Sequence, residues 1–327
     1  MLFMTSLMTG SLIAVSSSTW MGMWIGLEIN LLSIIPLMNN SSNKFSSEAS
    51  MKYFITQAIA SSIIMFSIIL MSKSLMELNT INLIFNSALL TKMGAAPFHF
   101  WMPEIMDGLS WLMCFIVLTI QKIAPMIILM YSNFNMIFFM YIIIFSLLVS
   151  SILGLNQISI RKIMAYSSIN HISWMICSML FMNSMWITYF IVYSLISMSI
   201  IMMCNYFNMF FINQIIFNLN QNFPLKLILI MNFLSLGGLP PFLGFMPKWI
   251  TVQSLINLNQ IFLSIIMIVL TLITLYYYLR ISYSTLMFNQ LELNYTMKPK
   301  FNEYFLYLVN FFTISGLILS TTLFNWL

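Results

Sequence analysis

The chain has 327 residues, of which 61% are hydrophobic and only 6% are charged, and its formal net charge is +5. Soluble domains carry about 25% charged residues, so this composition cannot cover a core with a water-exposed surface. The twelve basic residues are scattered, which excludes the clustered basic face that nucleic-acid binding requires. Lipid is therefore the solvent for most of the surface, and the sequence predicts an all-α polytopic membrane protein.

Polar, proline and glycine residues divide the apolar sequence into about eleven segments, each of the length that spans a bilayer as a helix. The predicted spans are 2–17, 20–38, 51–71, 80–102, 109–131, 136–153, 163–182, 185–213, 226–249, 258–281 and 304–326. We interpret 1–327 as a single membrane domain with two five-helix repeats, at about 1–131 and 136–285. The helix at about 304–326 is left over.

Three ionisable residues lie inside predicted helices of the first repeat. Glu28 is at the middle of the second helix, Lys92 lies in the fourth and Lys122 is central in the fifth. One such charge at a helix centre is unfavourable by about 2.5–3.5 kcal/mol, so intramembrane charges mark ion or proton pathways. A function for the chain must therefore explain these residues.

The fourth helix contains a glycine–proline break that recurs in the ninth. The segments Gly94-Ala-Ala-Pro-Phe-His-Phe-Trp-Met-Pro-Glu104 and Gly238-Leu-Pro-Pro-Phe-Leu-Gly-Phe-Met-Pro-Lys248 are identical at five aligned positions. Because one copy lies in an even-numbered helix and the other in an odd-numbered helix, they run in opposite directions through the membrane. Inverted repeats with broken helices indicate a transporter site near the midplane. Two ordinary proline kinks are the alternative interpretation.

The connections between helices carry an asymmetric basic charge. Only Lys73 lies beside an odd-numbered connection, whereas eight basic residues lie in or beside even-numbered ones. These eight are Lys44, Lys52, Arg161, Lys162, Lys226, Arg280, Lys298 and Lys300. The positive-inside rule therefore predicts that the N-terminus is on the positive side and the C-terminus on the opposite side.

A buried glutamate–lysine pair has a property that a proton pump needs. Burial favours the neutral form of each group, whereas an opposite charge nearby favours the charged forms, so separation of the pair changes its proton affinity. We expect Glu28 to pair with a lysine of a neighbouring helix. Lysine snorkelling to the headgroups is the alternative, and it is weakest for Lys122 and strongest for Lys248.

The histidines and cysteines do not form a metal or redox motif. His99, in the first break, and His171, in the seventh helix, are candidate proton relays, with an interhelical hydrogen bond as the equal alternative. Cys114, Cys177 and Cys204 have no C-x-x-C spacing, which excludes disulfide scaffolds and tetrathiolate metal or iron–sulfur sites within this chain. No cofactor-binding or metal site is predicted.

Seven sequence motifs identify a family. They are Gly26-Leu-Glu-Ile-Asn30, Glu48…Lys52-Tyr53-Phe54, Lys92-Met-Gly-Ala-Ala-Pro-Phe-His-Phe-Trp101, Gln121-Lys-Ile-Ala-Pro125, Gly154-Leu-Asn-Gln157, Arg161-Lys162…Tyr166-Ser-Ser-Ile169 and Leu236-Gly-Gly-Leu-Pro-Pro-Phe242…Pro247-Lys-Trp249. With these motifs the chain resembles, over nearly its whole length, the chain 2 family of mitochondrial NADH:ubiquinone oxidoreductase (respiratory complex I). Members of that family are antiporter-like subunits of the membrane arm.

The resemblance implies a proton-translocating core subunit of the mitochondrial inner membrane that couples electron transfer from NADH to ubiquinone to proton pumping. It implies that Glu28, Lys92, Lys122 and Lys248 form the half-channel and central axis of a relay. Its implied partners are other membrane-arm subunits, including neighbouring antiporter-like ones, and membrane lipids. The positive side is then the matrix, and the C-terminus lies toward the intermembrane space.

The resemblance also implies that the redox chemistry takes place elsewhere. The sequence has no nicotinamide, flavin or iron–sulfur signature, so NADH, FMN, iron–sulfur clusters and ubiquinone are expected on other parts of the complex. Two other functions fit the residues alone. A free-standing cation/proton antiporter would be favoured by an intramembrane aspartate pair, but no aspartate lies within a predicted helix. A structural spacer predicts that the four charged residues are replaceable.

Overall fold

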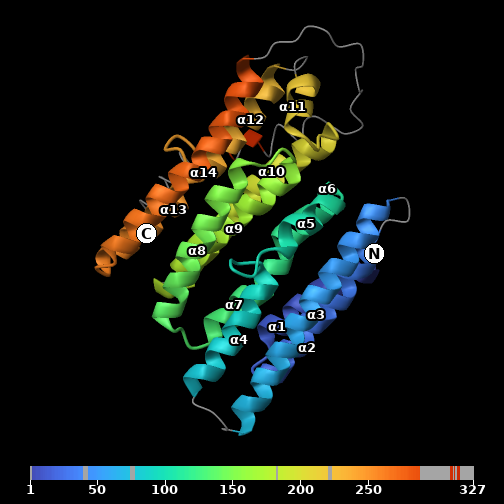
Figure 1. Ribbon diagram of the computed structural model, residues 1–327, viewed down its shortest axis with the longest axis vertical. Coiled ribbons are helices and arrows are strands. Elements are labelled where there is room, and N and C mark those ends of the chain that lie inside the picture. Colours follow the sequence, from blue (N-terminus) through green and yellow to red (C-terminus); the bar gives the residue numbers. More distant parts are fainter. Residues whose placement is uncertain are drawn as a thin grey trace. The chain divides into compact units, whose positions relative to one another are not determined.

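The computed structural model describes residues 2–39, 43–73, 78–181, 183–219 and 223–287, together with 310, 311, 313, 315 and 316. These residues form α-helices joined by turns (Figure 1), and one isolated antiparallel bridge pairs Ser159 with Phe211. Among the described residues, six helices are long and apolar enough to cross a membrane. In lipid, a helix satisfies its own backbone polar groups, so the predicted all-α multi-pass architecture is confirmed.

The chain divides into two compact units, Met1–Ser146 and Leu147–Leu327. The first contains α1 (Leu2–Ser16), α2 (Trp20–Met38), α3 (Lys44–Lys73), α4 (Leu78–Met93), α5 (Trp101–Gly108), α6 (Trp111–Leu118), α7 (Ile120–Tyr131) and the start of α8 (Met136–Leu155). Here α2 packs between α1 and α3, and α7 packs against α4. The first six predicted spans fall on these helices.

The second unit contains the rest of α8 and six further described helices. They are α9 (Ile160–Phe181), α10 (Asn183–Tyr206), α11 (Ile212–Leu219), α12 (Phe223–Gly237), α13 (Phe245–Asn257) and α14 (Ile261–Met287). The short helix α11 was not predicted as a separate element. The predicted span 304–326 lies almost entirely outside the described residues, as does most of the connection before it.

Both predicted breaks are present, and they have the same backbone hydrogen bonds. The N–H of Gly94 donates to Leu90 and Thr91, and the N–H of Ala95 donates to Leu90. The N–H groups of Gly238 and Leu239 repeat this pattern at the end of α12. Both glycines have left-handed backbones, with φ of +78° and +82°, as the Schellman ending of a helix requires.

The predicted fifth helix contains an interruption that the sequence did not indicate. It is divided at Thr119, between α6 and α7, where the backbone has φ −120° and ψ −74°. The Thr119 hydroxyl donates to the carbonyl of Phe115 at 2.7 Å, and the N–H of Lys122 donates to the carbonyl of Thr119 at 3.0 Å. One turn later, Pro125 has no N–H to donate to Gln121.

Glycine allows the helices of the first unit to approach closely. A Cβ atom added to Gly26 of α2 would lie 2.5 Å from the backbone nitrogen of Ala14 in α1. A Cβ added to Gly108 of α5 would lie 2.5 Å from the carbonyl oxygen of Phe45 in α3. Small residues at such contacts are how membrane helices pack, because lipid provides no hydrophobic driving force for their association.

Most described serine and threonine hydroxyls donate to their own helix. Ser33 donates to the carbonyl of Asn30 at 2.9 Å, Ser178 to Met175 at 2.7 Å and Ser235 to Asn232 at 2.7 Å, each three residues earlier. A hydroxyl bonded in this way satisfies its polarity locally, so it can be buried in an apolar environment without a partner on another helix.

Polar side chains bonded between helices are the exceptions. In the first unit, the Ser132 hydroxyl donates to the Asn86 side chain at 2.7 Å. In the second unit, the buried side chain of Asn232 on α12 hydrogen-bonds the side chains of Asn310 and Thr313. These bonds join segments that are far apart in the sequence. Because hydrogen bonds are directional and apolar contacts are not, they help to fix the orientation in which the segments pack.

Candidate functional site

Glu28 lies half-buried on α2, facing α3. Its Oε1 atom accepts a hydrogen bond from the Ser61 hydroxyl at 3.1 Å, and the carbonyl of Ser61 accepts one from the Trp24 indole at 3.0 Å. Its Oε2 atom is buried and has no hydrogen-bond partner among the described residues. One carboxylate oxygen is thus held by α3, and the other is available to water or a cation.

A small polar cavity lies in the same unit. The residues that line this Lys92 cavity are Leu27, Asn30 and Leu31 of α2, Tyr53 and Gln57 of α3, Lys92 of α4, and Gln121 and Pro125 of α7. The cavity has room for about one water molecule. Lys92, the only charged residue among the described residues of the lining, is 7% exposed, so its ammonium lies in protein rather than in lipid or bulk water.

Amide groups make the Lys92 cavity suitable for water. The Tyr53 hydroxyl donates to Oε1 of Gln121 at 3.2 Å. Oδ1 of Asn30, Nε2 of Gln57 and Nε2 of Gln121 are buried without a hydrogen-bond partner in the described part of the chain. Buried polar groups of this kind are usually satisfied by ordered water, so the cavity offers both donors and acceptors to a water molecule.

Glu28 and Lys92 interact electrostatically, but not as a direct ion pair. Lys52 forms ion pairs with Glu48 and Glu104, whereas no direct ion pair joins Glu28 to Lys92 in the described part of the chain. An attraction between charges that are not in contact is sensitive to movements of α2 against α4, because the interaction energy depends on distance and on the water between the charges. Glu28 and Lys92 thus lie in one unit and interact without direct contact.

Lys122 lies in the same unit, one residue after Gln121 of the cavity lining. Its side chain is 2% exposed, among the most deeply buried of the large side chains described. It lies in the first turn of α7, three residues after the interruption at Thr119. Neighbouring side chains on a helix point about 100° apart, so Gln121 and Lys122 occupy adjacent faces of α7.

Lys248 lies in the second unit, at the start of α13, and is 7% exposed. Its Nζ donates to the carbonyl of Gly237 at 2.9 Å and to that of Leu236 at 3.3 Å. The same atom lies 6.0 Å from the centroid of the Trp174 ring. This lysine is thus held inside the protein, which removes snorkelling as an account of it.

The two histidines are both buried. His99 lies in the break between α4 and α5, with its ring centroid 4.4 Å from that of Phe100. On α9 of the second unit, Nδ1 of His171 is 2.9 Å from the Tyr189 hydroxyl, and its ring centroid is 5.0 Å from that of Tyr193. The hydrogen bond places His171 in a polar environment that also includes buried tyrosines.

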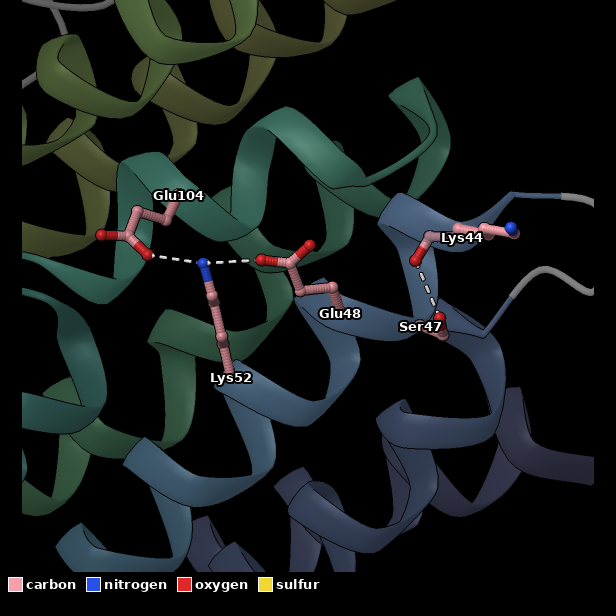
Figure 2. A network of polar contacts seen from close by, with 5 residues as sticks. All are labelled: Lys44, Ser47, Glu48, Lys52 and Glu104. Atoms are coloured by element: carbon pink, nitrogen blue, oxygen red, sulfur yellow. Dashed lines mark hydrogen bonds and ion pairs between the residues drawn. The ribbon is translucent and has the colours of Figure 1, made fainter.

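Glu104 occupies the place in the first break that Lys248 occupies in the second. Figure 2 shows its carboxylate reaching the Lys52 ammonium of α3 at 2.9 Å, with Glu48 on the other side at 3.0 Å. These side chains are about half exposed. α3 has 30 residues and is about 45 Å long, so its ends extend beyond a hydrocarbon core of about 30 Å.

Neutral polar residues of the Lys92 cavity were missed by the sequence reasoning, which considered charge alone. These residues are Asn30, Tyr53, Gln57 and Gln121. One signal was present in α3, where Tyr53, Gln57 and Ser61 recur every four residues in an apolar helix and therefore share one face. A polar stripe of this kind indicates a buried polar surface when the solvent is lipid.

Comparison with known proteins gives consistent results. Residues 17–274 match the family described as NADH:quinone oxidoreductase/Mrp antiporter, transmembrane. NADH-ubiquinone oxidoreductase chain 2 of Anopheles gambiae is 50% identical, over 97% of this chain and 96% of the relative. The protein of the same name from Aedes aegypti is 49% identical, over 99% and 97%. That of Lemur catta is 36% identical, over 99% and 95%.

Solved structures share the fold at low sequence identity. A chain of respiratory complex I from Thermus thermophilus, determined with bound aureothin, has a TM-score of 0.87 and 20% identity, covering 96% of this chain and 76% of that one. A chain of the membrane-bound sulfane sulfur reductase, an archaeal respiratory membrane complex, has a TM-score of 0.85 and 15% identity, covering 99% and 73%.

Proposed function

The chain belongs to the NADH:quinone oxidoreductase/Mrp antiporter transmembrane family, and from this premise we propose that it is a proton-translocating subunit of the membrane arm of NADH:ubiquinone oxidoreductase. Its relatives of that name match it at almost full length. It works with other membrane-arm subunits, among them neighbouring antiporter-like ones. The electron-transfer centres lie on other subunits, and this chain contributes the proton pathway.

The observation that carries this proposal is the Lys92 cavity. Lys92 lines a polar cavity of about the size of a water molecule and interacts electrostatically with Glu28. Helix packing alone does not explain a charged residue in this position, because its burial is energetically unfavourable. While Glu28 acts on Lys92, the ammonium form is favoured; when the two separate, burial favours the neutral amine and a proton is released. Water held by Asn30, Gln57 and Gln121 offers that proton a route toward Lys122.

The proposed relay has the functional order Glu28, Lys92, Lys122, Lys248. His171 is a candidate member in the second unit, since its ring nitrogen is hydrogen-bonded to the Tyr189 hydroxyl. His99 is the corresponding weak candidate in the first. Lysine suits such a relay because its proton affinity changes readily with burial, whereas arginine keeps its proton.

The two breaks support an inverted-repeat organisation, with repeats at about 1–131 and 136–285. Each break has a left-handed glycine and the same set of backbone hydrogen bonds, although only five of eleven residues are identical. Broken helices in matching positions are the usual binding elements of transporters built from such repeats.

The proposed location is the mitochondrial inner membrane, with the N-terminus on the matrix side and the C-terminus toward the intermembrane space. We expect a cysteine introduced beside Arg161, at the start of α9, to react with a membrane-impermeant thiol reagent only from the matrix side, because basic connections remain there. Labelling of mitoplasts against inverted inner-membrane vesicles measures this. Reaction from the intermembrane-space side would contradict the proposed orientation.

The experiment that tests the function compares two glutamates. Glu28→Gln keeps a side chain that can accept the Ser61 hydrogen bond but removes the negative charge that acts on Lys92. We expect protons pumped per NADH oxidised to fall severalfold in reconstituted complex, with assembly retained. Glu104→Gln is the matched control, since Glu104 is exposed and lies outside the cavity lining. Equal pumping by both variants would favour the structural-spacer alternative.

A further inference from the structure

The way α12 ends leaves two specific carbonyls without helical donors. In the Schellman ending, the N–H of Gly238 donates to Leu234 and Ser235, and the N–H of Leu239 donates to Leu234. These bonds satisfy the earlier carbonyls of the last turn, but not those of the final two helical residues, Leu236 and Gly237. Unsatisfied carbonyls at a helix C-terminus carry the negative end of the helix dipole and favour a cation.

The Lys248 side chain binds both of these carbonyls. Its Nζ donates to Gly237 at 2.9 Å and to Leu236 at 3.3 Å, and the face of the Trp174 ring lies 6.0 Å away. An aromatic face at this distance attracts a cation through its quadrupole. Trp174 is 1% exposed, and its indole nitrogen has no hydrogen-bond partner among the described residues, so its ring rather than its N–H meets the ammonium.

Gly238 provides the space through which the lysine reaches these carbonyls. A Cβ atom at this position would lie 2.9 Å from both Cδ and Nζ of Lys248 and 3.2 Å from its Cε. The φ of +82° is a second reason for glycine, because L side chains rarely adopt that conformation. The residue is thus required both by the turn and by the side chain that crosses it.

We propose that Gly238 and Trp174 are positioning residues for Lys248. Together with the carbonyls of Leu236 and Gly237, these two residues form a cage around the Lys248 ammonium group. This inference rests on the proposed role of Lys248 in proton translocation. The backbone carbonyls at the helix break then bind the charged form of Lys248 directly. A shift of the end of α12 relative to α13 changes the number of acceptors that the ammonium has.

The first break shows that the cage is not a general property of this turn. There the carbonyl of Thr91 accepts a hydrogen bond from the Trp101 indole at 3.0 Å. The residue at the place of Lys248 is Glu104, whose carboxylate would be repelled by helix carbonyls and instead binds Lys52 (Figure 2). The two turns thus have the same backbone hydrogen bonds but different polar side chains, and among the described residues an ammonium donates to the carbonyls of the second turn only.

The test uses the assembled complex, purified with a variant chain and reconstituted in liposomes, with protons pumped per NADH oxidised as the readout. Trp174→Leu removes the aromatic face and should lower this ratio about threefold, the size of a modest cation–π interaction. Trp174→Phe keeps an aromatic face and loses only an N–H without a described partner, so it should retain most of the ratio. Trp249→Leu, at an exposed tryptophan next to Lys248, should leave it unchanged.

Gly238→Asn supplies the second test, because asparagine tolerates a left-handed backbone better than other side chains but still places a Cβ atom against Lys248. It should lower the ratio while the complex assembles. Normal pumping by both Gly238→Asn and Trp174→Leu, with pumping lost in Lys248→Met, would overturn the cage and leave the relay intact. Normal pumping by Lys248→Met would instead refute the proposed function of Lys248. If Gly238→Asn does not assemble, equal effects of Trp174→Leu and Trp174→Phe would overturn the cage.

Discussion

Replacement of Lys122 by methionine is expected to reduce proton pumping far more than it reduces assembly of the complex. Methionine has a similar length and no charge, so it fills the same fully buried site. A charge at the centre of a membrane helix is unfavourable by about 2.5–3.5 kcal/mol, and its removal should not weaken the fold. Only a function that requires the ammonium explains a loss of pumping with the chain still in place.

The measurement compares complex content on native gels with proton uptake by reconstituted vesicles at equal NADH:ubiquinone activity. Lys44→Met is the control, since it removes the same group from an exposed position at the start of α3. Pumping by Lys122→Met at the level of the unaltered chain would make the relay wrong and would favour the spacer alternative.

A valine at Gly26 is expected to prevent stable assembly. The added Cβ atom would lie 2.5 Å from the nitrogen of Ala14 and 2.7 Å from its Cα, and backbone atoms cannot turn away as a flexible side chain can. Overpacking typically costs about 1–3 kcal/mol, and a clash with backbone lies at or above the top of that range. We therefore expect α1 to separate from α2 and little assembled complex to remain.

Ile25→Val is the matched control, because Ile25 is adjacent in α2 and 45% exposed. The amount of assembled complex and its thermal inactivation temperature should be close to those of the unaltered chain. Normal amounts of complex with Gly26→Val would mean that the close contact of α1 with α2 is not needed for stability.

The helices could be predicted wherever their ends are marked by glycine, proline or polar residues. Gly94 and Gly238 predicted the two breaks, because a glycine that can adopt a left-handed backbone, followed closely by proline, is typical of the end of a helix. Thr119 carried no such mark, since threonine also occurs within continuous helices, and the interruption there depends on packing against other elements. The separate helix α11 was missed because its eight residues are far too few to span a bilayer, so most of it was assigned to the connection between two predicted spans.

The charged members of the candidate site could be selected from the sequence, because a charged residue within an apolar segment is energetically costly and easy to recognise. The amide groups around Lys92 could not be found in that way. Asn30 and Gln121 each stand next to a residue that drew attention, but only the packing of α2, α3, α4 and α7 shows that their side chains meet in one cavity. The hydrogen bonds of Lys248 could not be predicted for a similar reason, since its acceptors are backbone carbonyls, whose positions depend on how the helices pack.

The serines that donate to their own helices have a consequence for where protons cannot travel. A hydroxyl group can pass a proton only if it can rotate between a donor and an acceptor, and each of these is held by a carbonyl three residues earlier. The helices are rich in hydroxyls, but hydroxyls held in this way do not donate to one another. A pump that works against a proton gradient loses energy through any stray path, so we expect hydroxyls held in this way to contribute little to proton leakage.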